Sequence, residues 1–156
     1  MKKKLLLVLF MMSTIFLLLL IGKYNGGSGD VSNLKIDANA IDYQPRDEVE
    51  PPNVETIRLP IYKTFEMTEG DTLNASLENP KDNPCYFQYT LTLTETNEEI
   101  YRSNLIKPGT AINQVKLNTN LLKGVYKLKL TISTWSLEDI ETAMNGGEMI
   151  TTLVVR

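Results

Sequence analysis

Residues 121–133 read LLKGVYKLKLTIS, and this stretch decides the fold. From Tyr126 onward, apolar and polar residues alternate: the apolar set is Tyr126, Leu128, Leu130 and Ile132, and the polar set is Lys127, Lys129, Thr131 and Ser133. A period of two is that of a β-strand, so the four apolar side chains share one face. Gly124 gives the backbone the freedom that a turn requires. The stretch therefore predicts a half-buried strand after a tight turn, with the Tyr126 hydroxyl placed to bond back to that turn.

Similar short segments lie on both sides of this stretch, separated by turn residues. The predicted strands are residues 57–65, 72–77, 87–94, 99–103, 111–117, 126–133 and 149–155. Pro60 cannot donate a ladder hydrogen bond, so the first of these strands belongs at an edge or a bulge.

The spacing of these strands leaves no room for the helical crossovers that a parallel sheet requires. Two antiparallel sheets packed face to face fit the pattern, and a tyrosine corner before a late strand is typical of immunoglobulin-like domains. We therefore expect an all-β fold, a seven-stranded antiparallel sandwich of the immunoglobulin-like type.

One segment, residues 135–147, interrupts the alternation. Ser136 followed three residues later by Asp139 resembles the start of a helix, and Asn145-Gly146 resembles its end. This pattern predicts one or two helical turns that cap one end of the sandwich.

The N-terminus has a different character. Three lysines, at positions 2–4, precede residues 5–21, which are uncharged and almost entirely apolar. We expect residues 1–22 to form a transmembrane signal anchor, with the N-terminus inside and the C-terminal domain outside the cell membrane. The alternative is a signal peptide whose cleavage releases a secreted protein. Residues 23–55 are glycine-rich and then acidic, which predicts a flexible linker to a domain at residues 56–156.

Charge and composition exclude several classes of function. The chain has a net charge of −3, and without the three N-terminal lysines it has 13 basic against 19 acidic residues, a net charge of −6. This balance argues against binding of nucleic acid. The chain has no histidine and one cysteine, Cys85, so serine–histidine catalysis, histidine-containing zinc sites and an internal disulfide are excluded. We expect no enzymatic activity, no cofactor and no metal.

Two groups of residues are candidates for binding a partner. The first is the loop with Glu138, Asp139 and Glu141, with the single tryptophan, Trp135, at its base. The second is Tyr101 and Arg102 at the end of a predicted strand. The alternative for the loop is that Trp135 covers the end of the core and the acids only face water. For Cys85, a buried apolar role is weighed against an intermolecular disulfide.

Three short motifs carry a resemblance: Leu77-Glu78-Asn79-Pro80, Ile106-Lys107-Pro108-Gly109 and Leu122-Lys123-Gly124-Val125-Tyr126. Together they resemble small surface proteins of Gram-positive bacteria, and they are similar to immunoglobulin-like domains of the CARDB and proteinase-inhibitor type. The resemblance spans residues 57–156 and implies fold and location, and it assigns no site residue.

These observations lead to one expected function and two alternatives. We expect a non-enzymatic interaction module at the cell surface, tethered to the membrane through residues 5–21, as an accessory subunit of an envelope assembly. Its partner would be another envelope protein or a wall polymer. The alternatives are a module that binds cell-wall glycan and a secreted protein similar to proteinase inhibitors.

Overall fold

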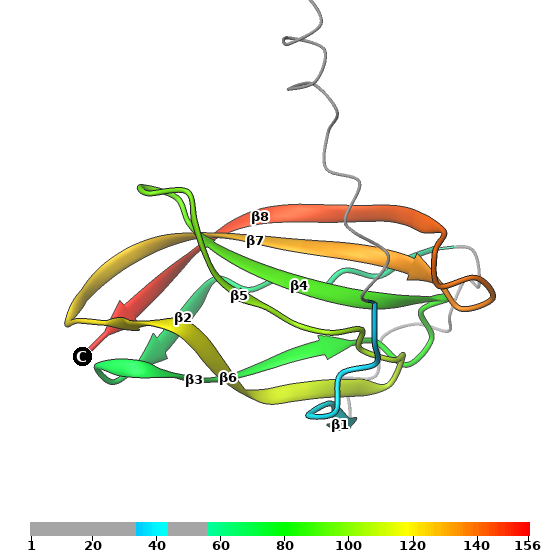
Figure 1. The fold of residues 1–156 in the computed structure, drawn as a ribbon, viewed down its shortest axis with the longest axis horizontal. Helices are drawn as coiled ribbons and strands as arrows, with labels where there is room; N and C mark the ends of the chain where they lie inside the picture. The colour runs from blue at the N-terminus through cyan, green and yellow to red at the C-terminus, as the bar shows by residue number, and fades with distance from the viewer. Residues whose placement is uncertain (1–33, 44–55) are drawn as a thin grey trace, which may run out of the picture. The chain divides into compact units, whose positions relative to one another are not determined.

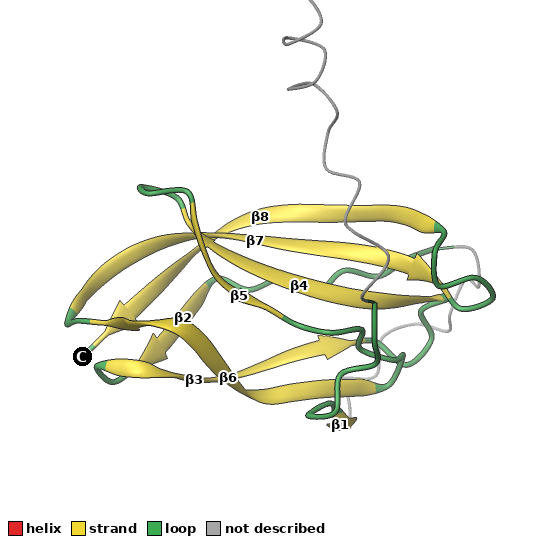
Figure 2. Cartoon of the chain, viewed as in Figure 1, coloured by secondary structure: helices red, strands yellow, loops and turns green. Residues whose placement is uncertain are grey.

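The computed structural model describes residues 34–43 and 56–156. These residues contain eight strands, joined by turns and loops, and no helix (Figure 2). The strands are β1 (Ile41–Asp42), β2 (Thr64–Met67), β3 (Gly70–Asn79), β4 (Cys85–Leu93), β5 (Glu98–Arg102), β6 (Thr110–Leu121), β7 (Gly124–Ser136) and β8 (Ala143–Val155). The predicted all-β fold is confirmed, and β1 is a strand that the sequence did not predict.

The strands form two sheets, drawn as two layers in Figure 1. The smaller sheet has the order β1-β6-β3, and the larger sheet has the order β2-β8-β7-β4-β5. Neighbouring strands are antiparallel, with one exception: β2 runs parallel to β8, and Phe65 lies opposite Leu153. The prediction of purely antiparallel sheets is therefore wrong at β2.

The core lies between the two sheets. On β7, the predicted apolar residues Leu128, Leu130 and Ile132 are fully buried. The smaller sheet contributes Leu73 and Leu77 from β3 to the same apolar cluster. Because both sheets direct their apolar residues into one cluster, the arrangement is that of a β-sandwich.

The tyrosine at the start of β7 bonds back to the preceding turn, as predicted. The Tyr126 hydroxyl donates a hydrogen bond to the backbone oxygen of Leu122 at 2.9 Å. Its ring packs against the buried cluster at the edge of the core. This bond fixes the direction in which the chain leaves β6 and enters β7.

The predicted helical turns in residues 135–147 are wrong. The strand β7 continues to Ser136, and β8 begins at Ala143 and not at residue 149. The Ser136 Oγ atom accepts hydrogen bonds from the backbone N–H groups of Glu138 and Asp139, at 3.1 and 3.3 Å, and the chain then turns back. Serine and aspartate can close a loop with the same bonds that cap a helix.

A glycine explains why β8 begins earlier than predicted. A Cβ atom on Gly146 would lie 2.1 Å from the backbone oxygen of Ile132. Only glycine permits this close approach, which accompanies a break in register between Ile132 and Thr134. Asn145-Gly146 therefore belongs to a bulged strand and does not end a helix.

The segment before β2 is held by side chains more than by strand pairing. The predicted strand at residues 57–65 coincides with β2 only at its last two residues. The backbone N–H group of Arg58 donates to the Asn83 side-chain oxygen at 2.8 Å, and Asn83 Nδ2 donates to the Arg58 backbone oxygen at 3.0 Å. Pro60 has no N–H group, which is consistent with the absence of regular pairing here.

Residues 34–43, which fall within the predicted linker, lie against the sandwich. The backbone N–H group of Asp37 donates to the Leu105 backbone oxygen at 2.7 Å, and β1 pairs with β6. The Asp37 carboxylate accepts from the backbone N–H groups of Asn39 and Asn104, both at 2.9 Å. The predicted transmembrane segment, residues 1–22, and the rest of the linker lie outside the described residues. In the ranges that are described, no helix has the length and apolar character needed to cross a bilayer.

Candidate binding groove

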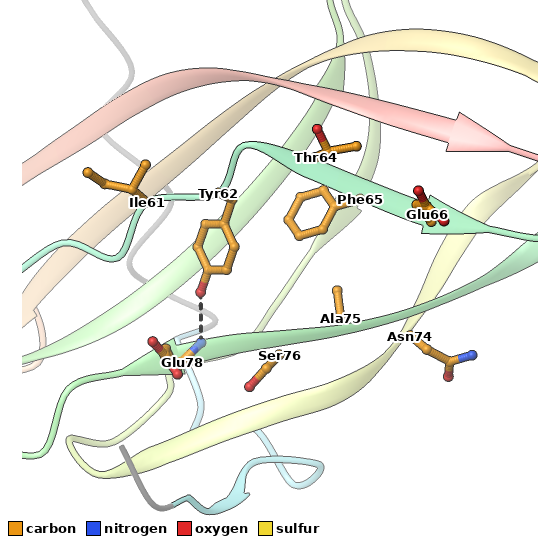
Figure 3. A pocket seen from close by; sticks show the side chains of 9 residues that line it. All are labelled: Ile61, Tyr62, Thr64, Phe65, Glu66, Asn74, Ala75, Ser76 and Glu78. Atoms are coloured by element: carbon orange, nitrogen blue, oxygen red, sulfur yellow. Dashed lines mark hydrogen bonds between the residues drawn. The ribbon is translucent and has the colours of Figure 1, made fainter. Parts of the chain in front are cut away.

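A groove lies at one edge of the sandwich, between β2 and β3 (Figure 3). Each of these strands is the last in its sheet, so the two sheets end side by side there without pairing to each other. The cavity has a volume of about 470 Å³, within the range of about 300–1,000 Å³ usual for ligand sites. Its lining residues are Ile61, Tyr62, Thr64, Phe65, Glu66, Asn74, Ala75, Ser76 and Glu78.

Two aromatic rings and one small residue form the apolar part of the groove lining. The rings of Tyr62 and Phe65 lie with their centroids 5.4 Å apart. Ala75 points from β3 toward Phe65 (Figure 3). Along β3 it occupies the inward position between the buried residues Leu73 and Leu77. Because alanine is small at a position where its neighbours are leucines, the edge of the core is not filled there.

A pair of tyrosine hydroxyls closes one end of the groove. Tyr62 Oη accepts a hydrogen bond from the backbone N–H group of Glu78 at 3.1 Å, and Tyr89 Oη donates to the Glu78 backbone oxygen at 2.5 Å. The two hydroxyl oxygens are 3.2 Å apart. Burial raises the pKa of Tyr62 to about 12 and raises the pKa of Tyr89 well above its ordinary value. Both hydroxyls therefore keep their protons at neutral pH.

The edge of β3 is irregular where it lines the groove. Asn74 lies opposite Gln114 and Leu77 lies opposite Ile112, so three steps along β3 match two steps along β6. This difference is a β-bulge, in which Ala75 and Ser76 together lie opposite the single residue Asn113 of β6. Glu78 already directs its backbone N–H and C=O groups away from β6, toward the tyrosines. Residues 74–78 thus present a sheet edge to the groove.

The charged groups that line the groove are both acidic. They are Glu66 on β2 and Glu78 on β3. Arg156 Nη2 lies 3.1 Å from Glu66 Oε1, but both side chains are more than half exposed, so this ion pair is screened by solvent. No lysine or arginine is among the lining residues.

The predicted acidic loop forms as one hairpin with Trp135 at its base. Glu138, Asp139 and Glu141 are exposed, as a partner-facing loop requires. The Asp139 carboxylate, however, accepts hydrogen bonds from the Thr142 hydroxyl and the Glu141 backbone N–H group, which lower its pKa. This carboxylate therefore stabilises the loop itself.

Trp135 is only 4% exposed, so its ring is not a surface on which a sugar could stack. It lies opposite Tyr86 on β4 and Ala143 on β8. This burial agrees with the alternative interpretation, in which Trp135 does not face a partner.

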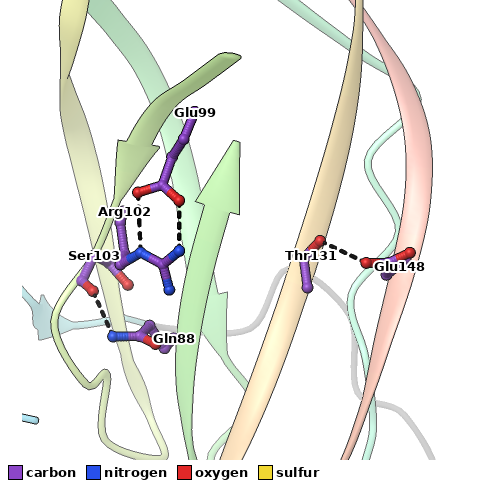
Figure 4. A network of polar contacts seen from close by, with 6 residues as sticks. All are labelled: Gln88, Glu99, Arg102, Ser103, Thr131 and Glu148. Atoms are coloured by element: carbon purple, nitrogen blue, oxygen red, sulfur yellow. Dashed lines mark hydrogen bonds and ion pairs between the residues drawn. The ribbon is translucent and has the colours of Figure 1, made fainter. Parts of the chain in front are cut away.

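Tyr101 and Arg102 lie on β5, at the far side of the larger sheet from β2. Arg102 forms a two-pronged ion pair with Glu99 on the same strand (Figure 4). Tyr101 is half-buried, and burial raises the pKa of its hydroxyl. The structure therefore separates this pair from the groove by three intervening strands, β8, β7 and β4.

Cys85 is fully buried in the core, as the apolar interpretation predicts. Burial raises the pKa of its thiol to about 11. Elsewhere in residues 34–43 and 56–156, no three histidine, cysteine or acidic side chains are grouped so that they could hold a metal ion.

The sequence did not identify the groove residues as a site, although it contains one sign of them. Between Leu73 and Leu77, the inward residue is alanine, which leaves space at that position. Whether such space reaches the surface depends on which strands lie at sheet edges, and the alternation alone does not determine that order.

No protein-family model, no curated protein and no solved structure matches this chain.

Proposed function

We propose that this protein is a non-enzymatic interaction module, held at the outer surface of the cell membrane by residues 5–21, that binds another envelope protein through the groove between β2 and β3. The groove is the observation that carries the proposal. It combines aromatic rings, a small residue and a sheet edge, and exposed sheet edges bind extended chains in many complexes.

We further propose that the sandwich is immunoglobulin-like. Three features support this assignment. β3 and β6 pair in one sheet as strands B and E do, and β8, β7 and β4 are neighbours in the other as strands G, F and C are. The hydrogen bond from Tyr126 to Leu122 has the form of a tyrosine corner.

Site-specific photo-crosslinking of the full chain in its own membrane tests the proposal. A photoreactive amino acid is placed at Ile61 or Ser76, which line the groove, and at Thr131 on the outer face of β7 as a matched control. We expect one envelope protein to be captured reproducibly from the groove positions and not from Thr131. If neither groove position captures a protein, binding through the groove is wrong. Capture from the 137–142 loop or from β5 alone would place the partner on that surface instead, and no capture from any position would overturn the interaction module itself.

The intact mass of the protein extracted from membranes tests the tether. A mass that includes residues 1–22 supports the anchored form. A mass that begins after residue 22 favours a secreted protein.

A further inference from the structure

We infer that the groove recognises a basic, extended peptide segment of the partner, which adds as a strand to the edge of β3 and inserts an apolar side chain beside Ala75. This inference rests on the proposed function and names the chemistry of its partner. It follows from the backbone, the interior and the charge of the groove.

The backbone of β3 supplies the first requirement for strand addition. Among the described residues, β3 pairs with β6 on one side and with no strand on the other. Regular pairing is also lost at Ala75 and Ser76, where the bulge lies. Unpaired N–H and C=O groups at a sheet edge are a template for another extended chain.

The ends of the groove limit the length of such a strand. At one end, residues 68–69 connect β2 directly to β3. At the other end, the hydrogen bond between Tyr62 and the backbone N–H group of Glu78 joins the two walls. Only residues 70–77 of β3 lie between these points, which at about 3.3 Å per residue is about 26 Å of strand. The groove therefore suits at most about eight residues of peptide.

The interior of the groove selects an apolar side chain. Phe65 and Tyr62 form one wall, and the Cβ atom of Ala75 faces them (Figure 3). Side chains of an added strand alternate between the two faces of the sheet, so at least one is directed toward this apolar space. A branched aliphatic side chain such as valine matches the alternation of a strand and the space beside Ala75.

The charge of the groove selects the sign of the peptide. Glu66, which forms a solvent-exposed ion pair with Arg156, lies on one wall and Glu78 on the other, and no lysine or arginine is among the lining residues. A lysine or arginine on the outward face of the added strand would lie near these carboxylates, whereas an acidic residue there would be repelled.

Peptide binding to the full chain in detergent micelles tests the inference. The probes are three fluorescent ten-residue peptides: alternating valine and lysine, alternating valine and glutamate, and the valine–lysine peptide with N-methylated valines. We expect fluorescence anisotropy to show the valine–lysine peptide binding at least tenfold more tightly than the valine–glutamate peptide. N-methylation should weaken binding by a similar factor, because it removes backbone donors from one edge of the peptide.

Two variants and a matched control test whether the peptide binds in the groove. Asn74→Trp adds bulk at an exposed lining position, and Ala75→Phe fills the apolar space. Thr131→Trp adds the same bulk as Asn74→Trp on a distant face. Asn74→Trp should weaken binding at least tenfold, and Thr131→Trp should leave it unchanged. Asn74 is exposed, so this test remains available if Ala75→Phe does not fold.

The outcomes separate this inference from the proposed function. Equal binding of the lysine and glutamate peptides, or unchanged binding to Asn74→Trp, overturns strand addition by a basic segment. If crosslinking from Ile61 or Ser76 still captures an envelope protein, the proposed function stands and only its recognition chemistry is wrong. If no position captures a protein, the proposed function fails independently of the peptide result.

Discussion

Tyr89 on β4 donates a hydrogen bond to the backbone oxygen of Glu78 on β3 at 2.5 Å, and so joins the two sheets across the core. Tyr62 Oη lies 3.2 Å from Tyr89 Oη and accepts from the Glu78 N–H group. Because the Tyr89 hydroxyl donates its proton to the Glu78 carbonyl oxygen, the hydrogen bond between the two tyrosines is donated by the Tyr62 hydroxyl. One residue of the β3 edge thus has both backbone groups satisfied by tyrosines, one on β4 and one in the segment before β2.

Replacing Tyr89 with phenylalanine should therefore destabilise the domain by about 1–3 kcal/mol, the usual cost of leaving a buried polar group without its partner. Urea unfolding of the full chain measures this change. Tyr126→Phe is a matched control, because its hydrogen bond to Leu122 lies at the surface and water can replace it. An equal loss in the two variants would contradict the interpretation that burial sets the cost.

The centre of β7 should be far more sensitive to truncation. Leu128 and Leu130 are fully buried in the core and have no contact with solvent. Replacing either with alanine should lower the free energy of unfolding by about 2–5 kcal/mol, through lost apolar burial and the cavity that remains. Lys127→Ala, on the outer face of the same strand, should change stability by less than about 0.5 kcal/mol.

A loss below about 1 kcal/mol at both leucines would mean that the register of β7 is wrong, because deletion of a fully buried leucine side chain costs more than that. Denaturant unfolding monitored through Trp135 fluorescence is a suitable measurement, since this tryptophan is buried at the end of β7.

The sequence predicted those parts of the fold that depend on local alternation. The apolar set Leu128, Leu130 and Ile132 faces the core as expected, and the Tyr126 hydroxyl bonds back to the preceding turn. Two predictions failed because one residue pattern serves two structures. Ser136 and Asp139 cap a tight hairpin loop with the bonds that would cap a helix. Gly146 permits a bulge where the pair Asn145-Gly146 predicts a helix end.

The candidate site was less predictable, for a physical reason. Tyr62, Phe65 and Ala75 are ordinary core residues by composition, and they form a groove only because β2 and β3 are both edge strands. Sheet order is determined by contacts between strands distant in the sequence. Trp135, in contrast, is a candidate from the sequence because it is the single tryptophan, and it is buried.

A buried threonine offers a stabilising substitution. Thr151 on β8 lies opposite Leu128, is 2% exposed, and its hydroxyl has no hydrogen-bond partner among the described residues. Thr151→Val removes this unsatisfied group with little change of shape, so it should stabilise the domain by about 1 kcal/mol. Thermal unfolding measures the change.

Thr152→Val is the control for that substitution, because Thr152 lies on the outer face of β8 and its hydroxyl accepts from Lys127 Nζ at 3.2 Å. It should have little effect on stability. Equal stabilisation by both substitutions would indicate that strand propensity, and not the buried hydroxyl, is responsible.

High pH should unfold the domain through its buried tyrosines and its cysteine. The pKa of Tyr62 rises from 10.0 to about 12 and that of Cys85 from 9.0 to about 11, in both cases because burial disfavours the charged form. The unfolded chain therefore loses these protons at lower pH than the folded chain. Stability is complete below about pH 9 and falls as the pH rises toward 12.

Tyr62→Phe should reduce this pH dependence between pH 10 and 12, relative to its own stability at pH 7. Urea unfolding at several pH values provides the comparison. A pH dependence identical to that of the unmodified chain would show that Tyr62 does not titrate in this range.

The Cys85 thiol should be almost unreactive in the folded protein. Alkylating reagents attack the thiolate, and a rise in pKa from 9.0 to about 11 reduces the thiolate population about a hundredfold at pH 8. The side chain is also fully buried, which denies access to the reagent. Iodoacetamide labelling followed by intact mass should therefore be slow in native buffer and fast in urea. Rapid labelling of the folded chain, or a dimer that dissociates only on reduction, would instead support the alternative interpretation of Cys85 as an intermolecular disulfide, because either result requires an accessible sulfur.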